Sequence, residues 1–313
     1  MMKTTARPNQ ASATHHRDLR TGQSIWSARR RPTVPTRPLT RDIHCDVVVI
    51  GAGISGALIA ETLSEAGLQV VVVDRRSPLD GSTAASTAML QYEIDTPLSL
   101  LSEQIGRDRA ERLWRRSRQS VDALRDRTER LGLKVDAATR GSIYLHGNVL
   151  DAEGLAREAD ARRRAGFEIE LLKPAAVLDR YGIKGRHAII GFGNYSADPR
   201  QLAAGYLNVA IGHGARVYSP VDICDVAPSE SRVTLQSADG REIRARTLVV
   251  ATGYEMMKGV PRKGNTIISS WSIATKPQPR AIWPTAAMIW GSRRPISLYR
   301  HHPGGRSDLR RRG

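Results

Sequence analysis

The chain has 313 residues, a formal net charge of +17, 40% hydrophobic residues and two cysteines. This length accommodates one large domain or two ordinary ones, and the hydrophobic fraction is too high for a mainly disordered protein. No run of residues reaches the ~18 consecutive apolar positions of a membrane helix. The sequence therefore predicts a globular protein without a membrane span.

The positive charge is concentrated at the two ends of the sequence. Residues 1–42 contribute +7 and residues 291–313 contribute +6, so the region between them retains only +4. No aromatic platform accompanies the arginines of either end, as nucleic-acid binding would require. We interpret both ends as solvated basic segments and expect no nucleic-acid partner.

Residues 1–42 are rich in Arg, Pro, Ser and Thr and show no apolar periodicity, which predicts a disordered segment. The segment lacks the apolar stretch of a secretory signal, and its prolines oppose the amphipathic helix of a mitochondrial transit peptide. We expect that deletion of residues 1–23 changes neither the fold nor cofactor binding. Cys45 and Cys224 lie in expected strands and outside any metal-binding pattern. They predict buried reduced thiols and a cytoplasmic protein, without a metal site.

In chain order, the first expected elements form a βαβ unit. Residues 46–50 are an apolar run typical of a buried parallel strand. Apolar residues then recur at helical spacing from Ile54 to Leu63, and Gly67 is placed to end that helix. Residues 68–73 form the second expected strand.

The later elements alternate between helices and short strands. Residues 100–135 are predicted to form amphipathic helices, followed by a strand over 141–145 and a helix over 151–166. Asp198 is the expected N-cap of a helix that continues to about residue 211, with Pro199 at its first position. A meander of short strands is then expected at 215–218, 221–227, 231–236 and 241–251.

Gly51, Gly53 and Gly56 form a GxGxxG motif between the first strand and the helix. Gly51 permits the tight turn, Gly53 lets the backbone approach a pyrophosphate, and Gly56 allows close contact between helix and strand. Asp74 ends the second strand, where its carboxylate can accept hydrogen bonds from ribose hydroxyls and would repel the 2′-phosphate of NADP. The motif in this context predicts a dinucleotide-binding site.

Two later segments favour FAD over NAD. Residues 248–253 (LVVATG) follow the meander and are similar to the second fingerprint of flavin enzymes, where small residues pass close to the cofactor. Residues 81–88 (GSTAASTA) offer hydroxyl and N–H groups to phosphate and flavin oxygens. An NAD-dependent Rossmann dehydrogenase remains the alternative enzyme, and a low-complexity surface loop is the alternative interpretation of residues 81–88.

Together these features resemble the D-amino-acid oxidase (glycine oxidase/sarcosine oxidase) superfamily of FAD-dependent oxidoreductases. One subgroup has a Ser-x-Trp element, here Ser24-Ile25-Trp26, and a GSTAAST loop followed by residues 91–95 (QYEID). The resemblance runs from about residue 24 to about residue 290. It implies an α/β fold with a Rossmann-like FAD-binding domain that includes the meander (43–100 and 196–255) and a partial α+β substrate domain (101–195 and 256–290).

The resemblance also implies contacts with the cofactor. Those with the pyrophosphate come from Gly51, Gly53, Ser55 and Gly56. Asp74 contacts the adenosine ribose, Arg75 lies near the adenine, and Val221 offers its backbone to the adenine. The residues that face the phosphates or the flavin, or lie along the cofactor, are Ser82, Thr83, Ser86, Thr252 and Gly253. Gln91, Tyr92 and Glu93 either border the flavin or have a structural role. No catalytic residue is assigned, because the flavin supplies the chemistry.

The implied function is oxidation of a small amine or amino acid by hydride transfer to FAD, with oxygen or another compound as electron acceptor. The family's chain continues past this length with a late glycine-rich segment. After Trp290 the sequence becomes rich in Arg, His and Gly, so we interpret residues 291–313 as an aberrant basic tail. Either a shifted reading frame produces this tail, or it is a genuine basic segment. We accordingly expect a truncated chain, for which a non-catalytic flavoenzyme fragment is the remaining alternative.

Overall fold

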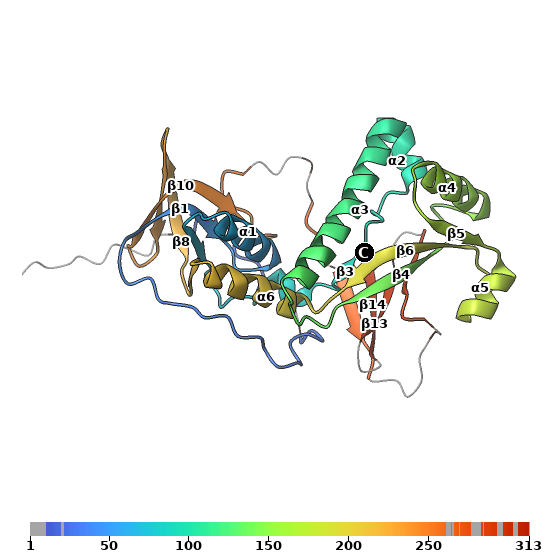
Figure 1. The fold of residues 1–313 in the computed structure, drawn as a ribbon, viewed down its shortest axis with the longest axis horizontal. Coiled ribbons are helices and arrows are strands. Elements are labelled where there is room, and N and C mark those ends of the chain that lie inside the picture. Colours follow the sequence, from blue (N-terminus) through green and yellow to red (C-terminus); the bar gives the residue numbers. More distant parts are fainter. Residues whose placement is uncertain are drawn as a thin grey trace, which may run out of the picture. The chain divides into compact units, whose positions relative to one another are not determined.

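The computed structural model describes residues 11–19, 22–260, 264, 266–268, 270–276, 283, 285–292, 297–302 and 306–312. The chain divides into two compact units (Figure 1): unit 1 comprises Met1–Ser86 and Asp198–Ile267, and unit 2 comprises Thr87–Ala197 and Ile268–Gly313. Each unit contains its own sheet and its own helices. The expected α/β fold class is confirmed.

Unit 1 is built on a sheet that has six strands among the described residues. In order across the sheet these are β7 (Arg216–Tyr218), β2 (Val70–Val73), β1 (Ile43–Ile50), β10 (Glu242–Val250), β9 (Val233–Ser237) and β8 (Ile223–Pro228). β1 pairs in parallel with β2 and β10, while β10, β9 and β8 form an antiparallel meander. Val48 and Val49 of the central strand are fully buried, as their continuous apolar run requires. The meander predicted from the sequence is confirmed.

Among its described residues, unit 1 also contains two helices, α1 (Ile54–Glu65) and α6 (Pro199–Gly212), and the 3₁₀ turn η1 (Ser82–Ala85). α1 connects β1 to β2 and packs against α6. The predicted start of α6 is observed, since the Asp198 carboxylate accepts hydrogen bonds from the amides of Arg200 and Gln201 at 2.9 and 3.2 Å.

The N-terminal segment lies against unit 1 over residues 11–19 and 22–42, which differs from the expected disorder. Trp26 is 2% exposed, and its indole N–H donates to the carbonyl of Ser86 at 2.7 Å. Arg37 forms a parallel bridge with Tyr218 in β7. The segment is held by single apolar side chains and by backbone hydrogen bonds. Neither kind of contact requires a periodic apolar pattern, so the sequence did not predict this order. Residues 1–10, 20 and 21 of the predicted disordered segment lie outside the described residues.

Unit 2 contains a larger mixed sheet and four helices among its described residues. Across the sheet the strands are β11 (Ser270–Ala274), β14 (Arg306–Arg312), β13 (Ser297–His302), β12 (Met288–Gly291), β4 (Ala138–Leu145), β6 (Ala188–Ser196) and β3 (Met89–Leu90), with β5 (Ile169–Leu172) also paired to β6. The helices are α2 (Leu98–Ile105), α3 (Arg107–Arg130), α4 (Ala152–Arg164) and α5 (Pro174–Tyr181). Strands β13 and β14 lie in the segment that was interpreted as an aberrant basic tail, and their pairing uses backbone groups that every residue type carries.

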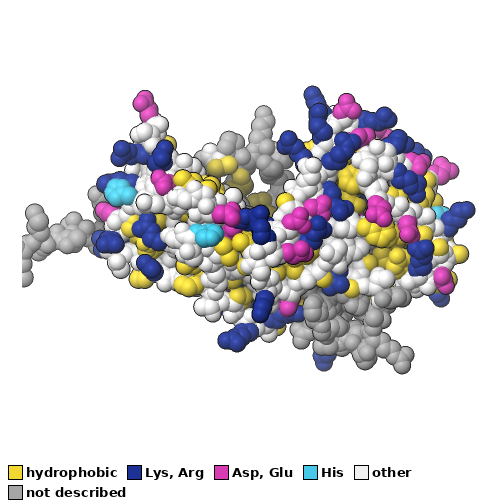
Figure 2. Space-filling model, viewed as in Figure 1, with side chains coloured by type: hydrophobic (Ala, Val, Ile, Leu, Met, Phe, Trp, Pro, Cys, Tyr) yellow, Lys and Arg dark blue, Asp and Glu magenta, His cyan; other side chains and the backbone are white. Residues whose placement is uncertain are grey.

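The helices of unit 2 carry charges of both signs on their exposed faces. Figure 2 shows Lys and Arg side chains interspersed with Asp and Glu over this unit. On α3, Arg118 pairs with Asp122 at 2.8 Å and Arg125 pairs with the same carboxylate at 3.1 Å. These side chains are half-buried at the surface, where ion pairs contribute little to stability. They do explain how an arginine-rich helix is accommodated on the surface.

Candidate functional site

A glycine turn joins the end of β1 to helix α1. Gly51 has a φ of +114°, and a Cβ atom there would lie 2.4 Å from the carbonyl oxygen of Ala251, which follows β10. A Cβ atom on Gly56 would lie 1.9 Å from the carbonyl oxygen of Gly51. Backbone therefore touches backbone at both positions, and only glycine fits the turn and the close approach of the helix.

The N-terminus of α1 faces this turn without a side-chain cap. Gly53 is the N-cap residue and offers no side chain to the first-turn amides. The amide of Ile54 donates instead to the hydroxyl of Thr83 in η1, at 3.0 Å. Thr83 was expected to face the phosphates or the flavin, and its hydroxyl in addition supports the helix. The remaining first-turn amides and the positive end of the helix dipole favour an anionic group here.

Asp74 lies at the end of β2, opposite the glycine turn. One carboxylate oxygen accepts from the amide of Ala52 at 2.7 Å, and the other accepts from the amide of Arg76 at 2.8 Å. Burial raises the pKa of Asp74, although both amides and the neighbouring arginines oppose the shift. The carboxylate is thus oriented by the backbone, and each oxygen retains a lone pair for a further donor.

The loop at 81–86 and the end of β10 meet beside the turn. A Cβ atom on Gly253, whose φ is +58°, would lie 3.5 Å from the hydroxyl oxygen of Ser82. Ser86 is placed differently from the expectation, because its carbonyl holds the Trp26 indole and the residue does not line the cavity described below. The amide of Val221 donates to the carbonyl of Asp74 at 2.8 Å, so the Val221 carbonyl is the backbone group left for a ligand.

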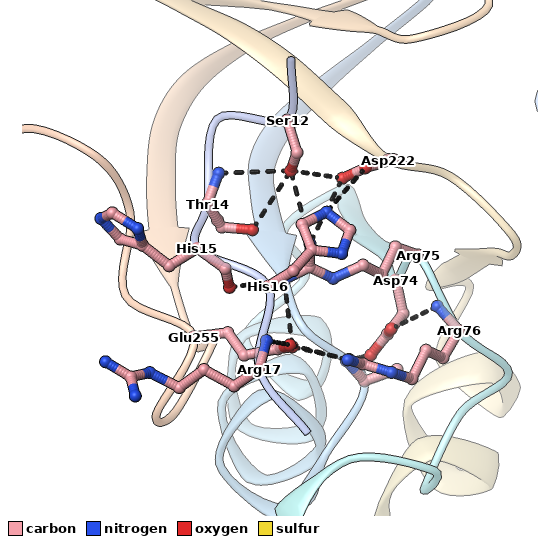
Figure 3. A network of polar contacts seen from close by, with 11 residues as sticks. Ser12, Thr14, His15, His16, Arg17, Asp74, Arg75, Arg76, Asp222 and Glu255 are labelled. Carbon is pink, nitrogen blue, oxygen red and sulfur yellow. Dashed lines mark hydrogen bonds and ion pairs between the residues drawn. The ribbon is translucent and has the colours of Figure 1, made fainter. Parts of the chain in front are cut away.

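A charged network borders the site next to Asp74 (Figure 3). The Glu255 carboxylate accepts two hydrogen bonds from Arg76, at 2.6 and 2.7 Å, and pairs with Arg75 at 3.0 Å. Arg75 also lies 3.9 Å from Asp222. The sequence analysis did not identify Glu255 or Asp222. The sequence does contain a signal for this network: an acidic residue follows the Ala-Thr-Gly segment after β10, and two arginines follow β2.

Glu255 carries a pH-dependent contribution to stability. Burial acts to raise its pKa, but hydrogen bonds from Arg76 and from the amide of Arg17, with the charges of both arginines, lower the pKa to about 2. A carboxyl group with a depressed pKa stabilises the fold above its usual value of 4.5, and that contribution is lost as the pH falls towards 2. We expect Glu255→Gln to melt at a lower temperature than wild type at pH 7, with the difference shrinking between pH 4.5 and pH 2.

The matched control is Glu242→Gln, which removes an exposed carboxylate paired with Arg244 on the same part of the chain. Its melting temperature should follow that of the wild type across the same pH range. The assignment is contradicted if the Glu255→Gln difference is constant from neutral pH to pH 2.

These elements enclose a cavity of about 90 Å³ in unit 1. Ten of the predicted cofactor-binding residues line it: Gly51, Gly53, Ser55, Asp74, Arg75, Ser82, Thr83, Val221, Thr252 and Gly253. Gly56 lies behind the turn and Ser86 lies away from the cavity. Thr14 and Leu19 of the N-terminal segment also line it, which the sequence did not predict. Segments from six separate parts of the chain thus converge on one site.

Two residues that follow the GSTAAST loop, Tyr92 and Glu93, are buried in unit 2. Tyr92 is fully buried and stacks on Phe167 with ring centroids 5.3 Å apart. Glu93 accepts a hydrogen bond from Ser142, and burial raises its pKa. Of the two roles left open for these residues, their surroundings favour the structural one.

Metal and membrane features are not found among the described residues. No group of three His, Cys, Asp or Glu side chains in that part of the chain is arranged to hold a metal ion. No helix in it is long and apolar enough to cross a bilayer. Cys45 and Cys224 form no disulfide, and both are only partly buried, whereas buried reduced thiols were expected. Burial still raises the pKa of Cys45 to about 11.

Comparison with known protein families identifies the family of this chain. The FAD dependent oxidoreductase family matches residues 46–308. The chain belongs to this family. The predicted family and its cofactor, FAD, are confirmed over the alternative family of NAD-dependent dehydrogenases. The family match extends through β13 and into β14, beyond the point at which the sequence resemblance was expected to end.

Individual relatives share the family but are distant in sequence. The chain is 23% identical to the "Probable oxidoreductase OrdL" of Haemophilus influenzae, over 78% of this chain and 58% of the relative. It is 24% identical to the gamma-glutamylputrescine oxidoreductase of Escherichia coli, over 73% and 53%. The structure of L-proline dehydrogenase from P. horikoshii superposes with a TM-score of 0.67 at 17% identity, covering 86% of this chain and 70% of that one. The chain spans about half the length of the curated relatives it matches.

Proposed function

We propose that unit 1 binds FAD at the ends of β1 and β2 and that the chain serves the oxidation of an amine or amino acid. The observation that carries this proposal is the convergence of the glycine turn, Asp74 and Thr252-Gly253 on one cavity. The chemistry that FAD would supply there is two-electron oxidation at the carbon that bears the substrate nitrogen, with oxygen or another compound as the final electron acceptor. The protein contributes binding and orientation.

The residues around the cavity fit the cofactor. The turn at Gly51 and Gly53 leaves no side chain between the backbone and a pyrophosphate, and the uncapped amides of α1 would bind its oxygens. Asp74, held by two backbone amides, would accept hydrogen bonds from the adenosine ribose. Arg75 and the Val221 carbonyl would lie at the adenine. Ser82, Thr83, Thr252 and Gly253 would line the remaining length of the cofactor.

The substrate class follows from the relatives. The E. coli relative is named for gamma-glutamylputrescine, which carries an amine, and the P. horikoshii structure is that of an enzyme for L-proline. We propose that this chain likewise takes a small amine or amino acid, with oxygen or another compound as acceptor. Cys45 and Cys224 form no disulfide, which supports a reducing compartment, so we place the protein in the cytoplasm.

Asp74→Ala is expected to weaken FAD binding by about 1–3 kcal/mol, the cost of leaving bound hydroxyl groups without a charged acceptor. Titration of the apoprotein with FAD, followed by the change in flavin fluorescence, measures the dissociation constants of both chains. Thermal melting of each chain reports any separate loss of stability from the two lost backbone contacts.

The matched control is Asp46→Ala, because the Asp46 carboxylate also accepts a backbone hydrogen bond, from the amide of Gln69 at 2.9 Å. Asp46 lies in the middle of β1 and does not line the cavity. Its affinity for FAD should equal that of the wild type. An Asp74→Ala chain that binds FAD as tightly as the Asp46→Ala chain refutes the proposed ribose contact.

A further inference from the structure

Residues 11–19, here called the strap, are held by backbone pairing beside the cavity of unit 1. The amide of Ala13 donates to the carbonyl of Ile223 at 2.7 Å, and the carbonyl of Ala13 accepts from the amide of Lys258 at 2.8 Å. The amide of His15 donates to the carbonyl of Met256 at 3.0 Å. The strap is therefore bound between the start of β8 and the segment after β10, which are more than 200 residues away in the sequence.

The strap also engages the charged network beside Asp74 (Figure 3). The hydroxyl of Ser12 donates to Asp222 at 2.8 Å, and the amide of Arg17 donates to Glu255 at 2.9 Å. Arg75 donates to the carbonyl of His15 at 3.3 Å and to the Ser12 hydroxyl at 3.4 Å. The arginine expected beside an adenine is thus directed at the strap.

Two side chains of the strap fill space in the proposed FAD site. Thr14 is 5% exposed and lines the cavity together with Asp74 and Val221. Leu19 lies at the other end, with its methyl group 3.9 Å from the position that a Cβ atom on Gly81 would take. The cavity that remains measures about 90 Å³. Pockets for organic ligands of this kind typically measure about 300–1,000 Å³.

We propose that the strap is an internal competitor of the adenosine half of FAD, so that the strap leaves the site when the cofactor binds. The inference rests on the proposed function. It assigns the N-terminal segment an autoinhibitory contact, made through Ala13, Thr14 and Arg17. Because FAD then binds only the fraction of molecules with the strap released, the apparent dissociation constant equals the intrinsic one divided by that released fraction.

The first test compares two substitutions at Ala13 in the full chain. Ala13→Pro removes the amide that donates to Ile223, whereas Ala13→Ser keeps it. We expect the FAD dissociation constant of Ala13→Pro to fall by about tenfold, through loss of strap pairing, and that of Ala13→Ser to match the wild type. Circular dichroism checks that both chains fold.

The second test needs no substitution. Hydrogen exchange at the amides of Ala13, His15 and Arg17 is measured in the wild-type chain with and without saturating FAD. Competition predicts faster exchange at these amides when FAD is bound. Slower exchange would mean that the strap closes over the bound cofactor, and this overturns the proposal.

The outcomes separate the inference from the function on which it rests. If Ala13→Pro binds FAD as tightly as wild type or more weakly, the competition is wrong and FAD binding stands. If neither Ala13→Pro nor the wild type binds FAD, the proposed function fails and the inference fails with it. Tighter binding by Ala13→Pro together with faster exchange supports both.

Discussion

Arg162→Leu is expected to lower the free energy of unfolding by about 3–5 kcal/mol, as measured by urea denaturation. Arg162 and Glu158 on α4 are both fully buried, and the Arg162 Nε donates to the Glu158 carboxylate at 2.7 Å. The same carboxylate accepts from the amides of Leu98 and Ser99, at 3.0 and 2.7 Å, and so caps the N-terminus of α2. Removing Arg162 leaves this charge buried without its counter-ion.

The electrostatics and packing of Arg162 support the size of this effect. Burial raises the pKa of Glu158, but Arg162 and the hydrogen bonds from Ser99 reverse the shift and lower it. The guanidinium also lies over the rings of Trp114 and Tyr144, 4.7 and 5.0 Å from their centroids. Leucine would restore part of the apolar contact but none of the charge compensation.

The neighbouring Arg163 provides a matched control. It pairs with Asp160 on the same helix at 3.1 Å, but both side chains are exposed. Arg163→Ala should change the free energy of unfolding by less than about 1 kcal/mol. If both variants lose the same stability, the special role of the buried pair in unit 2 is refuted.

Gly56→Ala is the second substitution with a large expected effect, a loss of about 3 kcal/mol of stability together with FAD affinity. The added Cβ atom would lie 1.9 Å from the carbonyl oxygen of Gly51, so the backbone of the turn has to move. Movement there displaces the amides at the N-terminus of α1, which are proposed to bind the pyrophosphate. Urea denaturation and FAD titration measure the two losses.

Gly212→Ala is the corresponding control in α6. A Cβ atom there would meet nothing within 4 Å, and the residue is helical. Alanine is favoured over glycine in a helix by up to about 1 kcal/mol, so this chain should be as stable as wild type or slightly more stable. A Gly56→Ala chain with wild-type stability would mean that the turn yields without cost.

The part of the fold that the sequence predicts best is local in the chain. β1, the glycine turn, α1, β2 and Asp74 follow one another within some thirty residues, and each step has its own apolar period or glycine. The meander and the cap of α6 at Asp198 are equally local. Such signals need no knowledge of distant neighbours, and the structure agrees with them.

The contacts that escaped the sequence analysis join distant positions through backbone or single side chains. Ala13 pairs with Ile223 without any apolar repeat, and Glu255 meets Arg76 across 179 residues. Arg162 belongs to a run of three arginines at the end of α4, a pattern typical of a solvent-exposed helix face. It is nevertheless buried, between Glu158 and the aromatic rings. No periodicity marks these partners, because each interaction depends on how the elements pack.

The central claim is that unit 1 holds FAD rather than NAD. The most direct measurement is titration of the full chain, freed of any bound cofactor, with FAD and separately with NAD, followed by calorimetry. The predicted result is saturable binding of one FAD per chain, with far weaker binding of NAD. The Asp74→Ala and Gly56→Ala chains should bind FAD more weakly than the wild type. Binding of NAD with no binding of FAD would contradict the assignment of the cavity.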